Sequence, residues 1–421
     1  PEAVQQVRAA SVFTTHTPVP AGHDVFSRDQ VQACAGPVWE TMGITREQFF
    51  QLGHHPELDQ GRFHMTAAAI RLSSRVNGVS SLHGEETRRI WQALWPGRDV
   101  SAIPIRHVTN GVHLATWMAN PIMDLLDAHL GADWGARLDD PALWDRVLSL
   151  DPGALWQVHT GLKAKLFEHV REDARRRWHT EWKEPGQLVG AGLLLSTDAL
   201  TIGFARRFAS YKRADLIFRD PERMRKILVN PRRPVQVIFA GKAHPADDHG
   251  KRVLQRVYGY ARDAGFEGRV TFLEDYEMHL AHRLVQSVDL WLNLPRVPME
   301  ACGTSGMKAA LNGVPQLATL DGWWAEGFTG WNGWAIPRAP HDRADELDAS
   351  HVYTLLEDEI VPLFFDRDAG GVPQGWVERM RQGMREAGQR FTARAMVQRY
   401  VREHYLPIMR GDATPGDPPD G

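Results

Sequence analysis

Cysteine is almost absent from this chain, which has only Cys34 and Cys302 among its 421 residues. Two cysteines cannot build a disulfide framework or a four-cysteine zinc site. Such sparse use of cysteine is typical of proteins from a reducing compartment. We therefore expect a cytoplasmic protein.

Long apolar runs and an excess of one charge are also missing. No run approaches the ~20 residues that cross a bilayer, and the first residues, PEAVQQVRAA, lack the apolar core of a signal peptide. The formal net charge is only -3, so no overall basic bias would attract nucleic acid. These absences predict a globular protein with neither membrane nor nucleic acid as a partner. The chain opens with Pro1 instead of methionine, which indicates a processed or partial chain.

Two familiar site motifs are missing as well. The histidines at positions 16, 23, 54, 55 and 64 lack the spacing of metal ligands such as H-E-x-x-H, so we expect no metal site. The AGK at 240–242 ends like a phosphate-binding Walker loop, but Gln236 and Val237 occupy the region of the earlier glycine. Nucleotide binding through such a loop is therefore not predicted.

Short apolar runs alternate with helical stretches between residues 198 and 320. The expected strands are 198–205, 235–241, 269–274, 288–294 and 315–321. The expected helices are 214–230, 250–265, 276–287 and 305–313. This pattern is typical of a doubly wound α/β domain, which binds ligands beyond the carboxyl ends of its parallel strands.

The rest of the chain predicts smaller units, since a chain of this length should hold two or three domains of about 100–200 residues. The runs ASVFTTH and IPIRHVTNG and the helix-like FHMTAAAIRLSSRVNG indicate a second α/β unit whose beginning is missing. Long helices are expected at 153–178 and 376–404. The expected division is a remaining part of an N-terminal domain at 1–110, a C-terminal domain at 111–375, a helical segment at 376–410 and a disordered tail at 411–421.

A basic segment, GFARRFASYKRADL, follows the first strand of the ordered region. It places Arg206, Arg207, Lys212 and Arg213 at the strand end where an α/β sheet collects anionic ligands. A phosphate site and a solvated basic helix start both fit this pattern.

A glycine turn, MEACGTSGMKAALNG, leads into a helix further along the chain. Backbone N–H groups and the hydroxyls of Thr304 and Ser305 would converge on an anion at the helix N-terminus. Lys308 lies about one turn into this helix, where partial desolvation would leave a neutral amine for Schiff-base chemistry. An ordinary helical lysine is the alternative. The tryptophans of DGWWAEG and GWNGWAIP are core residues or, as a further alternative, sugar contacts.

Together these segments resemble the α-glucan phosphorylases, the PLP-dependent retaining enzymes of the glycogen, starch and maltodextrin phosphorylase group. Their residues are most similar to those of the short bacterial branch of this family. The resemblance covers nearly all of the chain before the last helix. It runs in the family's order through THTPVPAGHDVF, NGVSSLHGE, HVTNGVHLATW, RRFASYKRAD, AGKAHP, FLEDYEMHLA and EACGTSGMKAALNGVPQLATLDG.

The resemblance implies a fold of two Rossmann-like domains of the GT-B type that face a central cleft, with the N-terminal domain only partly present. The activity that it implies is transfer of a terminal glucosyl unit from α-1,4-glucan or maltodextrin to inorganic phosphate, which gives α-glucose 1-phosphate. A proton shared between the coenzyme phosphate and inorganic phosphate would reach the glycosidic oxygen. A homodimer is also implied.

The resemblance also implies a role for individual residues. Lys308 would carry PLP covalently, Arg207 would hold inorganic phosphate, and Lys212 would lie between the two phosphates. The other residues expected around the coenzyme are Arg206, Gly303, Thr304, Ser305 and Trp117. Those expected to face the glucosyl unit are His16, Asn110, Tyr211, Glu300, Cys302 and Gly303, of which His16 joins Lys308, Arg207 and Lys212 as catalytic.

Three departures from the long relatives qualify these expectations. Glu277 occupies a position where they have arginine, and its carboxylate would repel the coenzyme phosphate. Ala209 occupies the position of a histidine, and Cys302 that of a serine. A glycine-rich stretch that approaches the coenzyme from the N-terminal domain is missing, so this segment alone should bind PLP weakly. The alternatives are a nucleotide-sugar glucosyltransferase of the same architecture, which would need no lysine at position 308, and an inactive glucan-binding relative.

Overall fold

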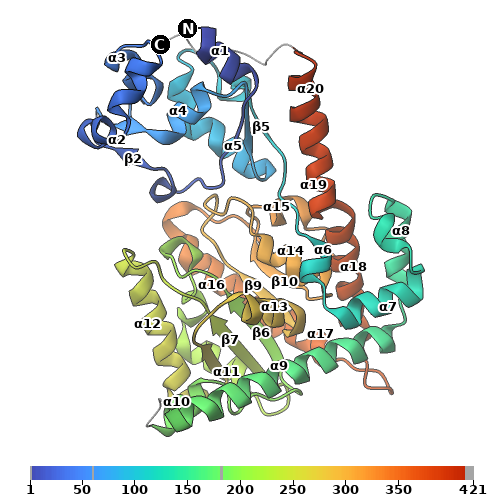
Figure 1. Cartoon of the computed structure of the whole chain (residues 1–421). Helices are drawn as coiled ribbons and strands as arrows, with labels where there is room; N and C mark the ends of the chain where they lie inside the picture. Colours follow the sequence, from blue (N-terminus) through green and yellow to red (C-terminus); the bar gives the residue numbers. More distant parts are fainter. Residues whose placement is uncertain (1, 59–60, 181–183, 413–421) are drawn as a thin grey trace.

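The computed structural model describes residues 2–58, 61–180 and 184–412, which form two lobes (Figure 1). The first lobe holds a three-stranded parallel sheet, and the second holds a six-stranded parallel sheet in the order β11-β10-β9-β6-β7-β8. The expected mixed α/β fold with parallel sheets is confirmed. Within the described ranges, no helix is both long and apolar enough to cross a bilayer.

The chain enters the six-stranded sheet at its inner strands. Strands β6 (Leu200–Ala205) and β7 (Val235–Ala240) are buried along their whole length, as expected for strands that carry helices on both faces. Each of the five expected runs contains a strand, the others being β8 (Val270–Leu273), β9 (Leu290–Asn293) and β10 (Gln316–Thr319).

The edge strand β11 (Gly333–Ile336) was not expected from the sequence. Its first residue lies so close to β10 that a Cβ at Gly333 would be 2.4 Å from the carbonyl oxygen of Gln316. Only glycine therefore permits this pairing. Because glycine is unfavourable in strands generally, strand propensity did not predict β11.

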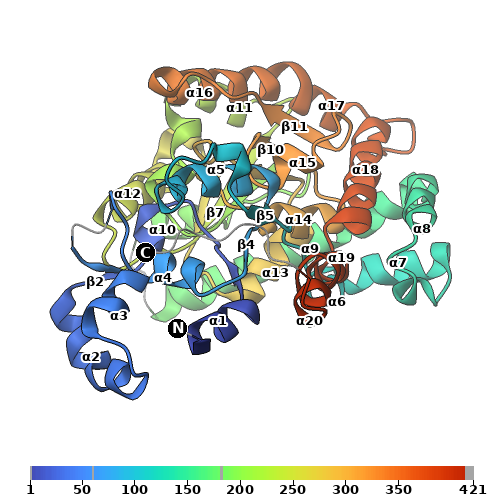
Figure 2. The same cartoon turned by 90° about the horizontal axis from the view of Figure 1, so that it is seen from above.

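Apolar side chains cover both faces of this sheet. On one face, Leu200 and Phe204 cluster with apolar residues of α11 (Pro221–Leu228) and α12 (Asp248–Arg262). On the other face, Ile238 clusters with residues of α9 (Pro152–Thr180) and α13 (Met278–Ser287). This two-sided burial is that of a doubly wound domain. Figure 2 shows α16 (Ala344–Leu355), α17 (Val361–Phe365) and α18 (Gln374–Arg390) following one another along one side of the molecule.

The first lobe contains β1 (Val12–Thr14), β4 (Arg75–Gly78) and β5 (Ile105–His107), with β4 in the middle. The strand runs at its two edges were expected, but the expectation of one helical stretch over 63–78 was wrong in its second half. The helix α4 (Met65–Arg71) ends before Ser73 and Ser74, and the chain then pairs with both neighbouring strands. Tertiary pairing overrides helical propensity here.

Two other expected helices are interrupted. The stretch 214–230 is a 3-10 turn followed by α11, whose N-terminus is set by the Asp220 cap and Pro221. The stretch 376–404 breaks between α18 and α19 (Ala393–Tyr400), where Val112 N donates to Phe391 O and Ala393 N donates to Val112 O. Long-range pairing with the connection between the lobes causes this break.

The end of the chain returns to the first lobe. The hydroxyl of Tyr400 lies 2.9 Å from Asn77 Nδ2 in β4, and Arg75 donates to Glu403 O. Figure 1 accordingly shows α19 and α20 (Leu406–Met409) beside the first lobe. The expected tail at 411–421 falls, from residue 413 onward, outside the described residues.

Candidate active site

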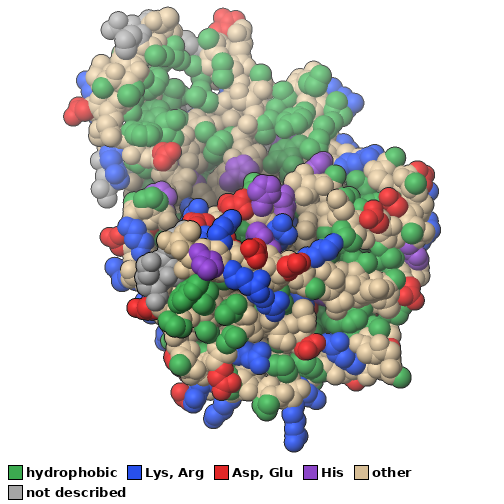
Figure 3. Space-filling model, turned by 60° about the horizontal axis from the view of Figure 1, so that its bottom comes forward, with side chains coloured by type: hydrophobic (Ala, Val, Ile, Leu, Met, Phe, Trp, Pro, Cys, Tyr) green, Lys and Arg blue, Asp and Glu red, His purple; other side chains and the backbone are tan. Residues whose placement is uncertain are grey.

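A cavity of about 420 Å³ lies between the lobes, beyond the carboxyl ends of β6 and β9. Histidine and basic side chains gather along the junction of the lobes on the face shown in Figure 3. The sequence-predicted residues that line this cavity are His16, Arg206, Arg207, Tyr211, Lys212, Glu300, Cys302, Gly303, Thr304, Ser305 and Lys308. Segments almost 300 residues apart in the chain therefore meet at one place.

The basic segment enters the cavity directly from the sheet. Strand β6 ends at Ala205, Arg206 and Arg207 follow, and the 3-10 turn η6 (Ser210–Lys212) brings Lys212 back toward the strand end. Arg213 does not take part, because its buried guanidinium donates to the Leu294 and Pro295 carbonyls and pairs with Asp345 and Asp348. Three of the four expected cations thus line the cavity, and the fourth anchors the turn.

One carboxylate sits among these cations. Glu300 Oε2 lies 2.6 Å from Arg206 Nη2 and 3.0 Å from Lys212 Nζ. Burial alone would raise the pKa of Glu300, but Arg206 and Lys212 hold it below its ordinary value. Burial, together with Arg206 and Arg207, lowers the pKa of Lys212 to about 8. The three basic side chains of this segment outnumber the one lining carboxylate, and this excess of positive charge favours an anion in the cavity.

The glycine turn forms the opposite wall. Thr304 and Ser305 begin α14 (Thr304–Leu311) and line the cavity, which places the first turn of this helix at the cavity wall. The hydroxyl of Ser305 lies 3.3 Å from Trp291 Nε1. This wall can receive a phosphate group beside the cations.

Lys308 also lines the cavity, with its Nζ 3.5 Å from the centre of the Trp117 ring. Burial lowers the pKa of Lys308 to about 8, which raises the fraction of neutral amine near neutral pH. A partly neutral lysine next to the first turn of a helix fits the requirements of covalently held PLP.

A second turn, which was not expected from the sequence, packs against the glycine turn. Asp321 is buried, accepts hydrogen bonds from Glu300 N (2.9 Å) and Gly322 N (2.8 Å), and follows β10. A Cβ at Gly322 would lie 2.4 Å from the carbonyl oxygen of Cys302, so the turn approaches as closely as glycine allows. Its position at the carboxyl end of a strand of the parallel sheet was the signal by which the sequence could have predicted it.

Two predicted residues lie behind the cavity instead of lining it. Trp117 packs against Lys308 as described, and Asn110 N donates to Val79 O, where Val79 itself is a lining residue. Tyr276, Met299 and Val79 line the cavity but were not predicted. Tyr276 follows β8, so the strand-end rule would have found it. Burial raises the pKa of the Cys302 thiol, which keeps it uncharged.

The two other departures lie outside the cavity lining. Glu277 caps α13, accepting from His279 N at 2.9 Å and Leu280 N at 2.8 Å, and borders a separate cavity beside α9. Ala209 is buried just before η6. The carboxylate that was expected to repel a phosphate is therefore engaged by its own helix.

Comparison with known proteins gives consistent matches. A family model for carbohydrate phosphorylases matches residues 38–326. The chain is 41% identical over 411 residues to glycogen phosphorylase of Aquifex aeolicus, covering 97% of this chain and 59% of that protein. It is also 41% identical to glycogen phosphorylase of Mycobacterium tuberculosis (96% and 48% covered) and to maltodextrin phosphorylase of Thermococcus litoralis (96% and 47%). The chain thus spans about half the length of the curated relatives it matches.

Proposed function

Because this chain belongs to the carbohydrate phosphorylase family, we propose that it carries the coenzyme and phosphate site of an α-1,4-glucan phosphorylase. The reaction is transfer of a terminal glucosyl unit from glycogen or maltodextrin to inorganic phosphate, with retention, to give α-glucose 1-phosphate. The observation that carries the proposal is the meeting of Lys308, Arg207 and Lys212 in one cavity at the carboxyl ends of the strands.

The proposed coenzyme is PLP, which Lys308 would hold covalently; Trp117 lies beside this lysine. The helix start at Gly303, Thr304 and Ser305 supplies N–H and hydroxyl donors, and Arg206 and Lys212 supply positive charge. When bound, PLP supplies a phosphate group that can exchange a proton with inorganic phosphate. The lowered pKa of Lys308 supports this assignment.

The chain's own residues bind and orient the substrates. Arg207 and Lys212 hold inorganic phosphate at the positive end of the cavity, where their charges stabilise the phosphate anion. This phosphate gives a proton to the glycosidic oxygen, the bond from that oxygen to the glucosyl carbon breaks, the shortened glucan leaves, and a phosphate oxygen bonds to the glucosyl carbon. His16, Tyr211 and Glu300, which line the same cavity, bind the glucosyl hydroxyls. The backbone at Cys302 and Gly303 contributes further donors. Asn110 stabilises the first-lobe wall of the cavity through its hydrogen bond to Val79 O.

Phosphate-dependent release of glucose 1-phosphate from maltodextrin tests the proposal. The unmodified protein should release it, and borohydride treatment should fix PLP on Lys308. Lys308→Ala should lose both coenzyme and activity, whereas Arg207→Ala should keep the coenzyme and lose phosphate use. Glucosyl transfer from UDP- or ADP-glucose without bound PLP would instead support a nucleotide-sugar glucosyltransferase.

A further inference from the structure

The lobes are joined beside the cavity by a carboxylate to which the sequence pattern assigned no role. Glu326 lies in α15 (Trp324–Gly327) of the second lobe. Its Oε1 accepts a hydrogen bond from Ser81 N of the first lobe at 2.8 Å. The Thr109 hydroxyl lies 3.0 Å from Oε1 and 2.9 Å from Oε2. Both carboxylate oxygens are thus used by the opposite lobe.

The residues that Glu326 holds lead directly into the cavity. Ser81 is the first residue of α5 (Ser81–Ile90), and the preceding Ser80 donates its hydroxyl proton to Ala301 O at 2.7 Å. Thr109 precedes Asn110, whose N–H donates to Val79 O. Val79 and Ala301 both line the cavity, one from each lobe. The contact therefore links segments that form the two walls of the cavity.

The first turn of α5 depends on this contact for hydrogen-bond partners. The first N–H groups of a helix have no acceptor within the helix, and here Ser80 Oγ accepts from His83 N while Glu326 accepts from Ser81 N. A carboxylate at a helix N-terminus is also favoured by the helix dipole. In the part of the chain that the structure describes, no Lys or Arg forms an ion pair with Glu326. Its two oxygens are accordingly free for the other lobe.

We propose that Glu326 is a positioning residue that sets the separation of the two walls of the glucosyl site. It acts through Thr109 and Asn110 on the first-lobe wall and through α15 on the second-lobe wall, and it touches no reacting atom. The proposal rests on the proposed function for its kinetic consequence, but the lobe contact itself can be measured without activity. Opening the cleft requires the Glu326 hydrogen bonds to break, so the same residue opposes opening.

Hydrogen–deuterium exchange measures the contact directly. In Glu326→Ala, exchange of the Ser81 amide should accelerate by about 10-fold to 100-fold, the effect expected when a hydrogen bond to a charged group is lost. Thr109→Val removes the hydroxyl and should also accelerate it, whereas Thr109→Ser keeps the hydroxyl and should not. Glu357→Ala is the matched control, because Glu357 pairs with Arg223 of its own lobe at the surface.

Kinetics separates positioning from a merely structural role. Glu326→Ala and Thr109→Val should raise the KM for glucan about 10-fold, with little change in the KM for phosphate and with full PLP content. Thr109→Ser should restore the parent value. An unchanged Ser81 exchange rate in Glu326→Ala would overturn the proposal, as would loss of PLP together with activity. Absence of glucose 1-phosphate release in the unmodified protein would instead overturn the proposed function, and the exchange result would still decide the role of Glu326.

Discussion

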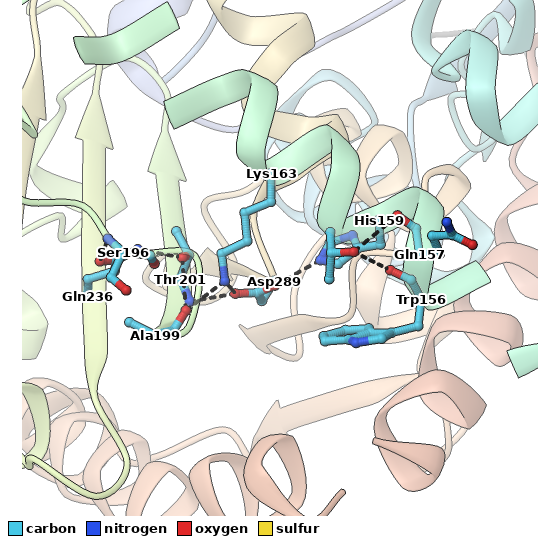
Figure 4. Close-up of polar contacts among 10 residues, drawn as sticks. Trp156, Gln157, His159, Lys163, Ser196, Ala199, Thr201, Gln236 and Asp289 are labelled. Atoms are coloured by element: carbon cyan, nitrogen blue, oxygen red, sulfur yellow. Dashed lines mark hydrogen bonds and ion pairs between the residues drawn. The ribbon is translucent and has the colours of Figure 1, made fainter. Parts of the chain in front are cut away.

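Two buried lysine–carboxylate clusters lie at opposite ends of the same two strands, β6 and β9. At the amino ends, Asp289 accepts from Lys163 Nζ at 2.6 Å and from Thr201 N at 2.7 Å, and His159 Nε2 lies 2.8 Å away (Figure 4). At the carboxyl ends, Glu300 pairs with Arg206 and Lys212. The chemistry of the two clusters is similar, but their surroundings differ.

The amino-end cluster is closed and balanced. The side chains of Lys163, His159 and Asp289 are at most 1% exposed, and Lys163 also donates to Ala199 O. Burial alone would raise the pKa of Asp289, but Lys163 and His159 hold it below its ordinary value. The carboxyl-end cluster faces a cavity of about 420 Å³ and has more cations than carboxylates. Balance and closure indicate a scaffold, while surplus charge beside a cavity indicates a ligand site.

The largest expected effect comes from breaking the closed cluster. Lys163→Met leaves the Asp289 carboxylate buried without its cation, so the free energy of unfolding should fall by about 3–5 kcal/mol. Urea unfolding followed by tryptophan fluorescence measures it. Lys251→Met is the control, since Lys251 pairs with Asp248 at the exposed surface and should change stability by less than about 0.5 kcal/mol.

A second substitution shows that charge is the cause. Asp289→Asn in the Lys163→Met background removes the unpaired charge and should recover part of the lost stability. If the double variant were less stable than Lys163→Met by a further several kcal/mol, packing instead of charge would explain the cluster.

The open cluster should respond in function more than in stability. Lys212→Met leaves Glu300 paired with Arg206 and removes a cation that Arg206 and Arg207 repel, so stability should change by no more than about 1 kcal/mol. The phosphorolysis rate should fall by about 10²–10³-fold, the usual loss when one electrostatic donor to a reacting anion is removed. Glucose 1-phosphate release measures this, with Lys251→Met as the control. A loss of stability comparable to that of Lys163→Met would erase the distinction between the clusters.

A smaller effect should follow from removing the carboxylate of the open cluster. Glu300 holds the cations that inorganic phosphate would use, so Glu300→Gln should free them. Phosphate binding in the absence of glucan should tighten about 10-fold, or about 1.4 kcal/mol. Isothermal titration with inorganic phosphate measures it. Weaker phosphate binding in Glu300→Gln would show that the carboxylate organises the cations instead of competing for them.

The sequence predicted the residues of the cluster at the carboxyl ends of the strands but not those of the cluster at the amino ends. The five strands and the basic and glycine segments were expected because apolar runs and motifs are local signals. The amino-end cluster was not, because Lys163 and Asp289 are 126 residues apart and neither belongs to a motif. Three other features were not predicted for the same reason, because each depends on contacts between distant segments. They are the burial of Arg213, the supporting turn at Asp321 and the break at Phe391. The roles assigned to individual cavity residues stay predictions.

The smallest expected effect is a pH dependence confined to the open cluster. Burial and the neighbouring arginines lower the pKa of Lys212 to about 8, so this lysine loses its proton at a pH where Arg206 and Arg207 stay charged. Phosphate should therefore bind more weakly as the pH rises from about 7 to about 9, because the cavity loses one of its cations. Titration of the PLP-bound protein at several pH values in constant ionic strength measures the dissociation constant, because PLP occupies the Lys308 amine, whose pKa of about 8 would otherwise contribute to the same interval. In Lys212→Met, binding should be weaker at neutral pH but should not weaken further over this interval. A decline of equal size in both proteins would assign it to another group and would leave Lys212 as a permanently charged residue like the arginines beside it.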